Sequence, residues 1–180
     1  ADPSDNLADP SDNLADPSVN CADPSVNCAD PSVNCAATYS RGMSSVFAKI
    51  IDGTAPARFV YSDEQCVAFL DIAPLSDGHT LVVPRKPVDH WLDADDELMA
   101  HLWKVTGLIG RAQSEAFPSR RIGVIVAGYE VPHLHIHTFP SMSMSDFSFY
   151  NKDHPPDPKR LDANAEALRA ALGEHAYAEG

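Results

Sequence analysis

The chain has 180 residues, with 26 acidic and 13 basic side chains and a formal net charge of −13 at pH 7. This balance argues against a protein that binds polymeric nucleic acid, because such proteins usually present a basic surface. No apolar run approaches the roughly 20 residues of a membrane-spanning helix, so the sequence predicts no membrane partner.

The N-terminal 35 residues form a seven-residue repeat, read as ADPSDNL twice and ADPSVNC three times. A coiled coil is excluded, because every repeat contains a proline and lacks paired apolar core positions. This composition buries too little apolar surface to fold, so residues 1–42 are predicted to be a disordered tail. The tail also lacks the charged and apolar regions of a secretory signal, which favours a cytoplasmic protein.

The segment from Met43 onward alternates between strand and helix patterns. Apolar periodicity and turn residues predict strands at 58–61, 66–70, 80–83, 122–126 and 133–137, and helices at 46–51, 95–117 and 163–172. Residues 140–160 are rich in Ser, Pro and Asp and are predicted to be loop. The order predicts an α+β fold, an antiparallel meander with a long helix on one face. We assign the domain to 43–145 and a C-terminal loop and helix extension to 146–180.

Three histidines alternate with apolar residues in the last predicted strand. Since side chains alternate along a strand, His133, His135 and His137 share one face, and Leu134 and Ile136 point to the core. A polar surface would rarely use three imidazoles. The pattern therefore indicates either a metal site or nucleophilic catalysis by one imidazole.

The metal interpretation requires further ligands. His79, Glu130 or Asp71 could supply one. In the nucleophile interpretation, one histidine attacks while its neighbours fix its tautomer and stabilise charge. The histidine pattern alone leaves both open.

The segment HLHIHTF, residues 133–139, resembles the motif of the histidine triad (HIT) superfamily, in which three histidines alternate with hydrophobic residues. Upstream segments match HIT domains in order and spacing. They are VFAKII at 46–51, VY at 60–61, AFLDIAP at 68–74 and GHTLVVPRK at 78–86. The resemblance covers roughly residues 44–140. It is strongest to small purine-nucleotide-binding HIT proteins, including nucleoside phosphoramidases and their actinobacterial relatives.

The resemblance implies a role for each matching histidine. His135 matches the nucleophile that attacks the α-phosphorus of a nucleotide and forms a nucleotidyl-histidine, which water then hydrolyses. His133 and His137 match residues that orient it or contact phosphate oxygens, and His79 matches a fourth histidine near the phosphate. The family also implies a homodimer, with helix 95–117 as a candidate interface, and no cofactor.

The nucleoside part of the expected site is also implied by the resemblance. Asp71 matches a carboxylate that accepts hydrogen bonds from ribose hydroxyls. The apolar walls around the base match Val46, Phe47, Ile50, Phe69 and Ile72.

The chain departs from the family pattern at two places. Many HIT proteins begin with a Cys-x-x-Cys that helps to bind structural zinc, but these positions hold Ser45 and Ala48, so no such zinc is expected. Before the triad, Tyr129 and Glu130 replace a Gln-Ser/Thr pair that touches phosphate. A carboxylate there repels an anion unless it is protonated, paired or turned away, and it could instead favour a cationic leaving group.

The sequence thus predicts hydrolysis or transfer at the α-phosphate of a phosphoramidate or dinucleoside polyphosphate through His135. Two alternatives remain. A non-catalytic nucleotide-binding module would keep the cleft without turnover, and Glu130 is its main support. A metalloenzyme using the three triad histidines is the other.

Overall fold

The computed structural model describes residues 45–152 and 157–177, so the heptapeptide repeat and the predicted domain start at Met43 lie outside the described residues. The strands are β1 Phe59–Ser62, β2 Cys66–Leu70, β3 Thr80–Pro84, β4 Arg121–Ile125 and β5 Ile136–Ser141. The helices are α2 Val46–Ile51, α3 Asp96–Ala116 and α4 Pro158–Leu172, with short 3₁₀ helices at Trp91–Asp93, Met144–Phe147, Phe149–Asn151 and Gly173–His175. Within these ranges, no helix is both long and apolar enough to span a membrane.

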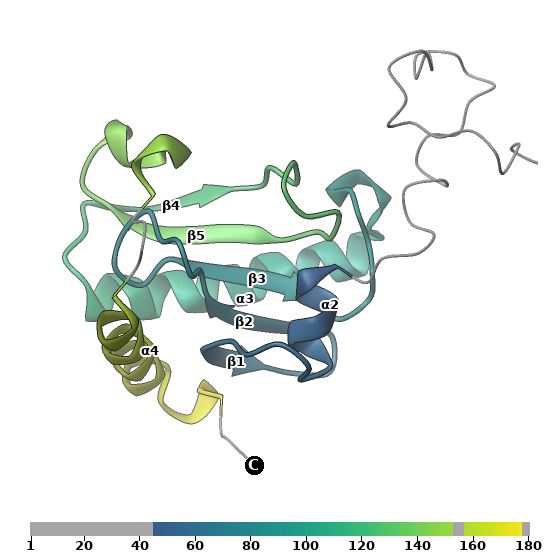
Figure 1. Cartoon of the computed structure of the whole chain (residues 1–180), viewed down its shortest axis with the longest axis horizontal. Helices are drawn as coiled ribbons and strands as arrows, with labels where there is room; N and C mark the ends of the chain where they lie inside the picture. Colours follow the sequence, from purple (N-terminus) through teal and green to yellow (C-terminus); the bar gives the residue numbers. More distant parts are fainter. Residues whose placement is uncertain (1–44, 153–156, 178–180) are drawn as a thin grey trace, which may run out of the picture. The chain divides into compact units, whose positions relative to one another are not determined.

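One five-stranded sheet, ordered β1-β2-β3-β5-β4, organises this part of the chain (Figure 1). Every neighbouring pair is antiparallel, which confirms the α+β class. The meander runs through β1, β2 and β3, and the chain then reaches the edge strand β4 before β5 returns between β3 and β4. The fully buried β5 is an interior strand, whereas β4, with an exposed Arg121, forms one edge.

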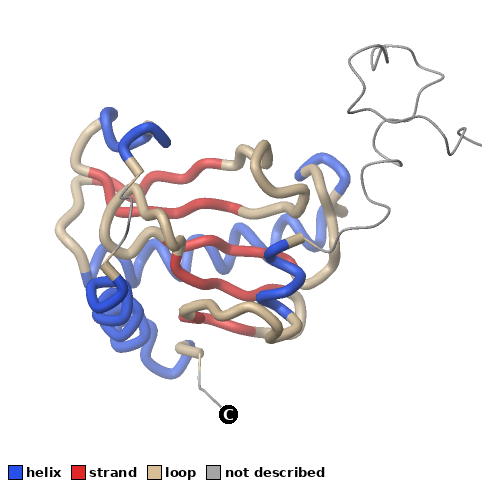
Figure 2. The backbone as a smooth tube through the Cα atoms, viewed as in Figure 1, coloured by secondary structure: helices blue, strands red, loops and turns tan. Residues whose placement is uncertain are grey.

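Helices cover both faces of the sheet (Figure 2). On one face, α3 packs against alternate strand residues, with Leu102 and Ile109 in the same core as Val82 and Ile136. On the opposite face, α2 packs against the intervening residues, Phe69 and Leu81 among them. Because successive strand residues point to opposite faces, β2 and β3 supply residues to both cores.

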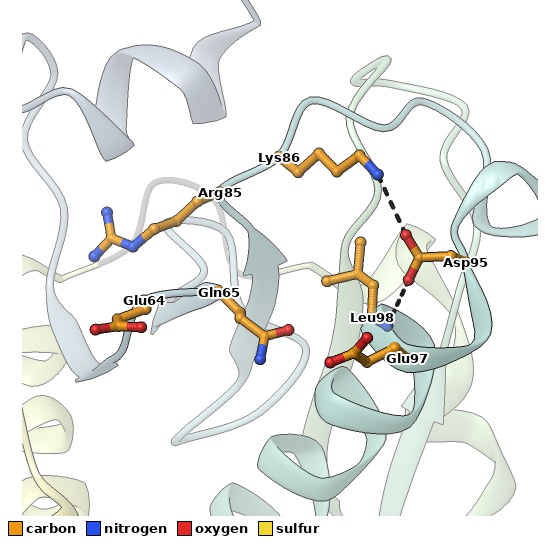
Figure 3. Close-up of a pocket in the computed structure, with 7 residues that line it drawn as sticks. All are labelled: Glu64, Gln65, Arg85, Lys86, Asp95, Glu97 and Leu98. Atoms are coloured by element: carbon orange, nitrogen blue, oxygen red, sulfur yellow. Dashed lines mark hydrogen bonds and ion pairs between the residues drawn. The ribbon is translucent and has the colours of Figure 1, made fainter.

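The long helix α3 begins where the sequence predicts. Asp95 is its N-cap, and its side chain accepts a hydrogen bond of 2.8 Å from the backbone N–H of Leu98 (Figure 3). Lys86 Nζ lies 3.3 Å from the other oxygen of Asp95. Asp96 and Glu97 add negative charge in the first turn, which favours the helix dipole.

The histidine segment is only partly a strand, which corrects the prediction of a strand over 133–137. The strand β5 starts at Ile136, which pairs with Val82. The Leu134 N–H donates instead to the carbonyl of Val88 at 2.6 Å, so the segment after Pro132 bonds outside the ladder. The alternation still holds, because Leu134 and Ile136 are buried in the α3 core. The predicted faces are therefore right although the strand boundary is wrong.

The C-terminal helix α4 begins at Pro158 rather than at Ala163. Asp157 caps it, and a proline in the first turn costs no hydrogen bond. Its Ala165, Leu168 and Leu172 join the α3 core, so this extension contributes to the same folded unit. The predicted loop over 140–160 contains the end of β5 and two short 3₁₀ helices.

Gly78, directly before the expected site residue His79, is predicted to be essential for stability. It has φ +79°, and a Cβ there would lie 2.4 Å from the ring of Phe117. Gly53 has φ +81°, but a Cβ there would have no heavy atom within 4 Å. Substitution at Gly53 therefore measures the cost of the backbone conformation alone. Alanine at Gly53 should lower the free energy of unfolding by about 1 kcal/mol, and alanine at Gly78 by roughly 1–3 kcal/mol more. Urea denaturation measures both, and equal losses would refute the close approach.

Candidate active site

A cleft of about 730 Å³ lies on the α2 side of the sheet. This volume suits a small organic ligand. The six residues expected around the nucleoside line it, together with Glu130 and two of the four expected catalytic histidines. They are Val46, Phe47, Ile50, Phe69, Asp71, Ile72, Glu130, His135 and His137.

The apolar wall of the cleft is also core. Phe47, Ile50 and Phe69 are buried, and the rings of Phe47 and Phe69 meet edge to face at 5.6 Å. Val46 and Ile72 lie at the rim and remain 48% and 68% exposed. The two rim residues offer exposed apolar surface that a flat ligand could cover. Removing this surface from water on binding would favour the complex.

The orientation of His135 is fixed by a backbone carbonyl. Its Nδ1 lies 2.7 Å from the carbonyl oxygen of His133. Since a carbonyl only accepts hydrogen bonds, we assign the proton to Nδ1, which leaves a lone pair on Nε2. Burial is the main cause that lowers the pKa of His135, while the charges of Glu130 and Lys152 act on it in opposite directions. A neutral imidazole that lines the cleft can therefore act as a nucleophile.

His137 and His79 form a hydrogen-bonded pair beside it. The backbone N–H of Leu75 donates to His79 Nδ1 at 3.0 Å, so we assign the His79 proton to Nε2. That N–H donates to His137 Nδ1 at 3.0 Å, which leaves His137 with a proton on Nε2. Burial lowers the pKa of His137 to about 3 and that of His79 well below its ordinary value. The pair thus places a neutral N–H donor next to the lone pair of His135.

His79 itself is buried and does not line the cleft. Its ring is hydrogen-bonded to His137, so within the site it contacts the cleft through that histidine.

The ring of His133 is also absent from the described cleft lining. Its Nε2 donates to the carbonyl of Pro84 at 2.8 Å, and its Nδ1 accepts from the hydroxyl of Ser45 at 3.0 Å. Ser45 in turn accepts from the N–H of Ala48 and caps α2. His133 therefore orients His135 through its carbonyl and ties α2 to the triad, and its imidazole is not directed at a phosphate.

Asp71 stands at the end of β2, where the strand meets the cleft. Its Oδ1 accepts from the N–H of Ala73 at 2.9 Å, and its Oδ2 lies 3.7 Å from His79 Nδ1. The carboxylate is buried and lines the cleft. It is thus fixed by the turn while facing the space for a ligand.

Among the cleft residues that the sequence did not assign to the site, Phe149 and Lys152 bear on its chemistry. Phe149 and Lys152 come from the segment that was expected to be loop. Lys152 Nζ lies 3.2 Å from Glu130 Oε2 and 4.9 Å from the centre of the Phe149 ring, and the rings of Phe149 and His137 are 5.2 Å apart. Glu130 is therefore paired with a cation rather than left as an isolated acid. The sequence of this segment has no periodic pattern, so its place in the cleft could be found only from the structure.

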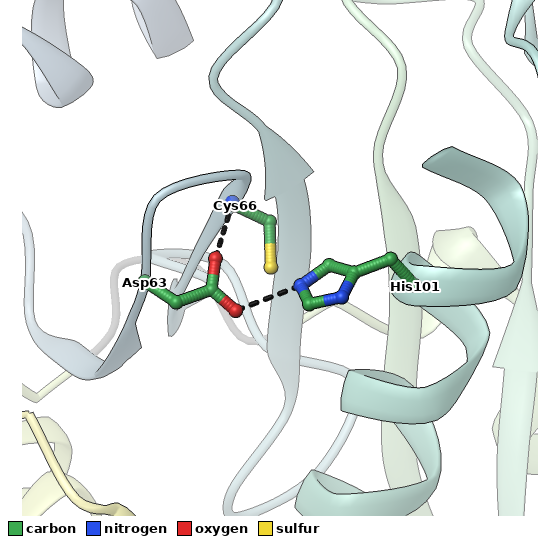
Figure 4. A group of neighbouring side chains, drawn as sticks. All are labelled: Asp63, Cys66 and His101. Carbon is green, nitrogen blue, oxygen red and sulfur yellow. Dashed lines mark hydrogen bonds and ion pairs between the residues drawn. The ribbon is translucent and has the colours of Figure 1, made fainter. Parts of the chain in front are cut away.

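The described residues contain two groups of potential metal ligands. In the group of Asp71, His79 and His137, both ring nitrogens of His79 already form hydrogen bonds. Figure 4 shows the other group, Asp63, Cys66 and His101, and none of the three lines the cleft.

This second group is a hydrogen-bonded turn. Asp63 accepts from the N–H of Cys66 and from His101 Nε2, each at 2.7 Å. Burial raises the pKa of the Cys66 thiol and keeps it protonated. The thiol is therefore not a ready metal ligand.

The zinc expected in many HIT proteins can be tested against this chain. Ser45 and Ala48 offer a hydroxyl and a methyl group in place of two thiolates, and the hydroxyl holds His133. These residues do not fit a thiolate zinc site.

Comparison with sequence relatives gives one family. The description "HIT domain" matches residues 52–144. An uncharacterized HIT-like protein of Methanocaldococcus jannaschii is 41% identical over 99 residues, which cover 53% of this chain and 77% of that protein. The adenylylsulfatase HINT3 of Arabidopsis thaliana is 30% identical over 135 residues, which cover 72% of this chain and 68% of that protein.

Solved structures lead to the same family. A zinc-bound histidine triad family protein from Mycobacterium smegmatis is 33% identical with a TM-score of 0.62, covering 72% of this chain and 94% of that one. A hypothetical histidine triad nucleotide-binding protein from Sulfolobus tokodaii is 29% identical with a TM-score of 0.62, covering 71% of this chain and 91% of that one. The match to the family description, the shared fold and the arrangement of the triad agree, and the chain belongs to the HIT family.

Proposed function

We propose that this chain hydrolyses a nucleotide conjugate, a phosphoramidate or a dinucleoside polyphosphate, at its α-phosphorus through a nucleotidyl intermediate on His135. One observation carries the proposal. The hydrogen bond from His135 Nδ1 to the His133 carbonyl leaves the Nε2 lone pair available in a cleft of suitable size. The family membership supports it, because one relative is named as an adenylylsulfatase and one solved neighbour as a nucleotide-binding protein.

The reaction is a double displacement. The Nε2 lone pair of His135 forms a bond to phosphorus, and the bond to the leaving group breaks with its electron pair moving to that group. An amine leaving group takes a proton from water, whereas a phosphate leaves as the anion. The imidazole ring gains positive charge, and the His133 carbonyl that accepts from Nδ1–H stabilises that charge.

Water completes the cycle. It attacks the phosphorus, the N–P bond breaks, and its electron pair returns to His135 Nε2 while one proton of the water passes to solvent. Throughout, the proposed role of His137 is to donate its Nε2–H to a non-bridging oxygen while staying neutral. His79 is a positioning residue that fixes this tautomer.

The nucleoside occupies the α2 end of the cleft in this proposal. Asp71 accepts from ribose hydroxyls, and a purine base lies against the apolar wall that contains Phe47 and Phe69. We also propose a homodimer with α3 as an interface element, supported by the half-exposed Trp103 on that helix. A cytoplasmic location stays a prediction from the sequence.

Product analysis in ¹⁸O-labelled water tests this function. The purified chain is incubated with adenosine and guanosine phosphoramidates and with dinucleoside polyphosphates. We expect a nucleoside monophosphate that carries one solvent oxygen on phosphorus, without added metal. Binding of nucleotide with no product would support the non-catalytic module, and turnover only with added zinc would support the metalloenzyme.

A further inference from the structure

Lys152 gives the cleft a cation from outside the segment that matches the HIT domain. The HIT match ends at residue 144, and Lys152 follows the short 3₁₀ helix Phe149–Asn151. Its backbone N–H donates to the carbonyl of Phe149, which closes that turn. Among the described residues that line the cleft, Lys152 is the one Lys or Arg. A C-terminal segment therefore supplies the positive charge that a phosphate-binding cleft requires.

Lys152 and Glu130 differ in how far their side chains are exposed to solvent. The Lys152 side chain is 14% exposed, whereas the side chain of Glu130 is 79% exposed. An exposed carboxylate is well solvated, so it can leave its partner at little cost. The Lys152 side chain, most of which is covered by protein, is the better-fixed partner of the two. A ligand anion that enters the cleft can thus replace Glu130 at Nζ.

The charge of Lys152 is directed toward the reacting groups. Its Nζ lies over the ring of Phe149, and that ring contacts His137 edge to face. Burial is the largest cause of the lowered pKa of His135 and His137, and the charge of Lys152 lowers both further. The ammonium is therefore electrically close to both imidazoles.

We infer that Lys152 binds the phosphate of the nucleotide and that Glu130 is its exchangeable partner in the empty cleft. This inference rests on the proposed function and deepens it, because the pair would set the preference for anionic ligands. It also gives Glu130 a different role from repulsion of phosphate. In the free protein it neutralises Lys152, and on binding it is released to solvent at the mouth of the cleft.

Calorimetric titration with adenosine, guanosine and their 5′-monophosphates tests this role. Lys152→Met should weaken binding of the preferred monophosphate by at least roughly tenfold, the loss expected for one charge-assisted hydrogen bond. Binding of the matching nucleoside should change less than about twofold, because it lacks the phosphate. Lys86→Met is the matched control, since Lys86 pairs with Asp95 outside this cleft, and it should alter neither ligand.

Glu130→Gln tests the exchange itself. Removing the competing carboxylate should tighten binding of the monophosphate in the wild-type background and have no effect when Lys152 is already Met. Lys152→Arg should retain most of the affinity.

Three outcomes would overturn the inference. Equal losses for nucleoside and monophosphate in Lys152→Met would show that Lys152 only holds the segment in place. Unchanged binding of the monophosphate to Lys152→Met would show that Lys152 does not bind the phosphate, and it would leave the proposed function standing. Failure of the wild-type chain to bind any of the four ligands would overturn the inference together with the proposed function.

Discussion

Replacing His135 with alanine should reduce product release from a nucleoside phosphoramidate by a factor on the order of 10³ or more. The Nε2 lone pair of His135 is the proposed nucleophile, and neither neighbouring histidine can substitute for it. The nitrogens of His133 are bonded to Pro84 and Ser45. The remaining polar atom of His137 is an N–H donor.

The same substitution should leave nucleotide binding largely intact, because the apolar wall and Asp71 are unchanged. Single-turnover kinetics measures the rate, and calorimetry measures the affinity. His175→Ala is the matched control, since this exposed histidine belongs to the short helix after α4. Loss of binding in step with the rate would mean that alanine damages the cleft, and an unchanged rate would reject His135 as nucleophile.

Acid should strongly destabilise the fold. Burial lowers the pKa of all four site histidines below the ordinary value of 6.5. The unfolded chain therefore binds protons that the folded chain does not as the pH drops below about 6.5. The stability is complete above that pH and decreases as the pH falls toward the folded-state pKa of each group.

Between pH 7 and pH 5, each histidine that stays neutral in the fold lowers the free energy of unfolding by roughly 2 kcal/mol. His137, whose pKa is lowered to about 3, stays neutral over this range and contributes that loss in full. The other three histidines, whose pKa values are also lowered, add to the loss, and a domain is stable by only about 5–15 kcal/mol. Asp63, whose pKa is lowered to about 2 by hydrogen bonds that outweigh the opposing effect of its burial, adds to the loss at still lower pH. Urea denaturation at pH 8, 7, 6 and 5 measures this slope. A free energy of unfolding that is flat from pH 7 to 5 would mean that the histidines are charged in the fold, which contradicts a neutral nucleophile.

Local rules applied to the sequence gave much of the fold. Apolar periodicity predicts the helix over 95–117, because it depends on residues a few positions apart, and the structure adds Asp95 as its cap. The alternation of His133, Leu134 and His135 predicts their faces correctly even though β5 begins later. Side-chain direction needs only an extended backbone, whereas the strand boundary depends on the bond from Leu134 to Val88 in a distant loop.

The site needed more than local rules. The resemblance to HIT proteins predicted six nucleoside-binding residues that do line one cleft, and periodicity alone could not have grouped them. It did not show that His79 acts through His137, because that bond depends on the pairing of β3 with β5. Lys152 and Phe149 were missed altogether, since they lie beyond the matched domain in a segment without periodicity.

The identity of the nucleophile is most directly tested by rapid quenching of the chain with a phosphoramidate, followed by intact-mass analysis and peptide mapping. The account predicts a transient, acid-labile nucleotidyl group on His135 whose rate of disappearance matches product release. Product formation at the full rate with no adduct, or with the adduct on another residue, would contradict it.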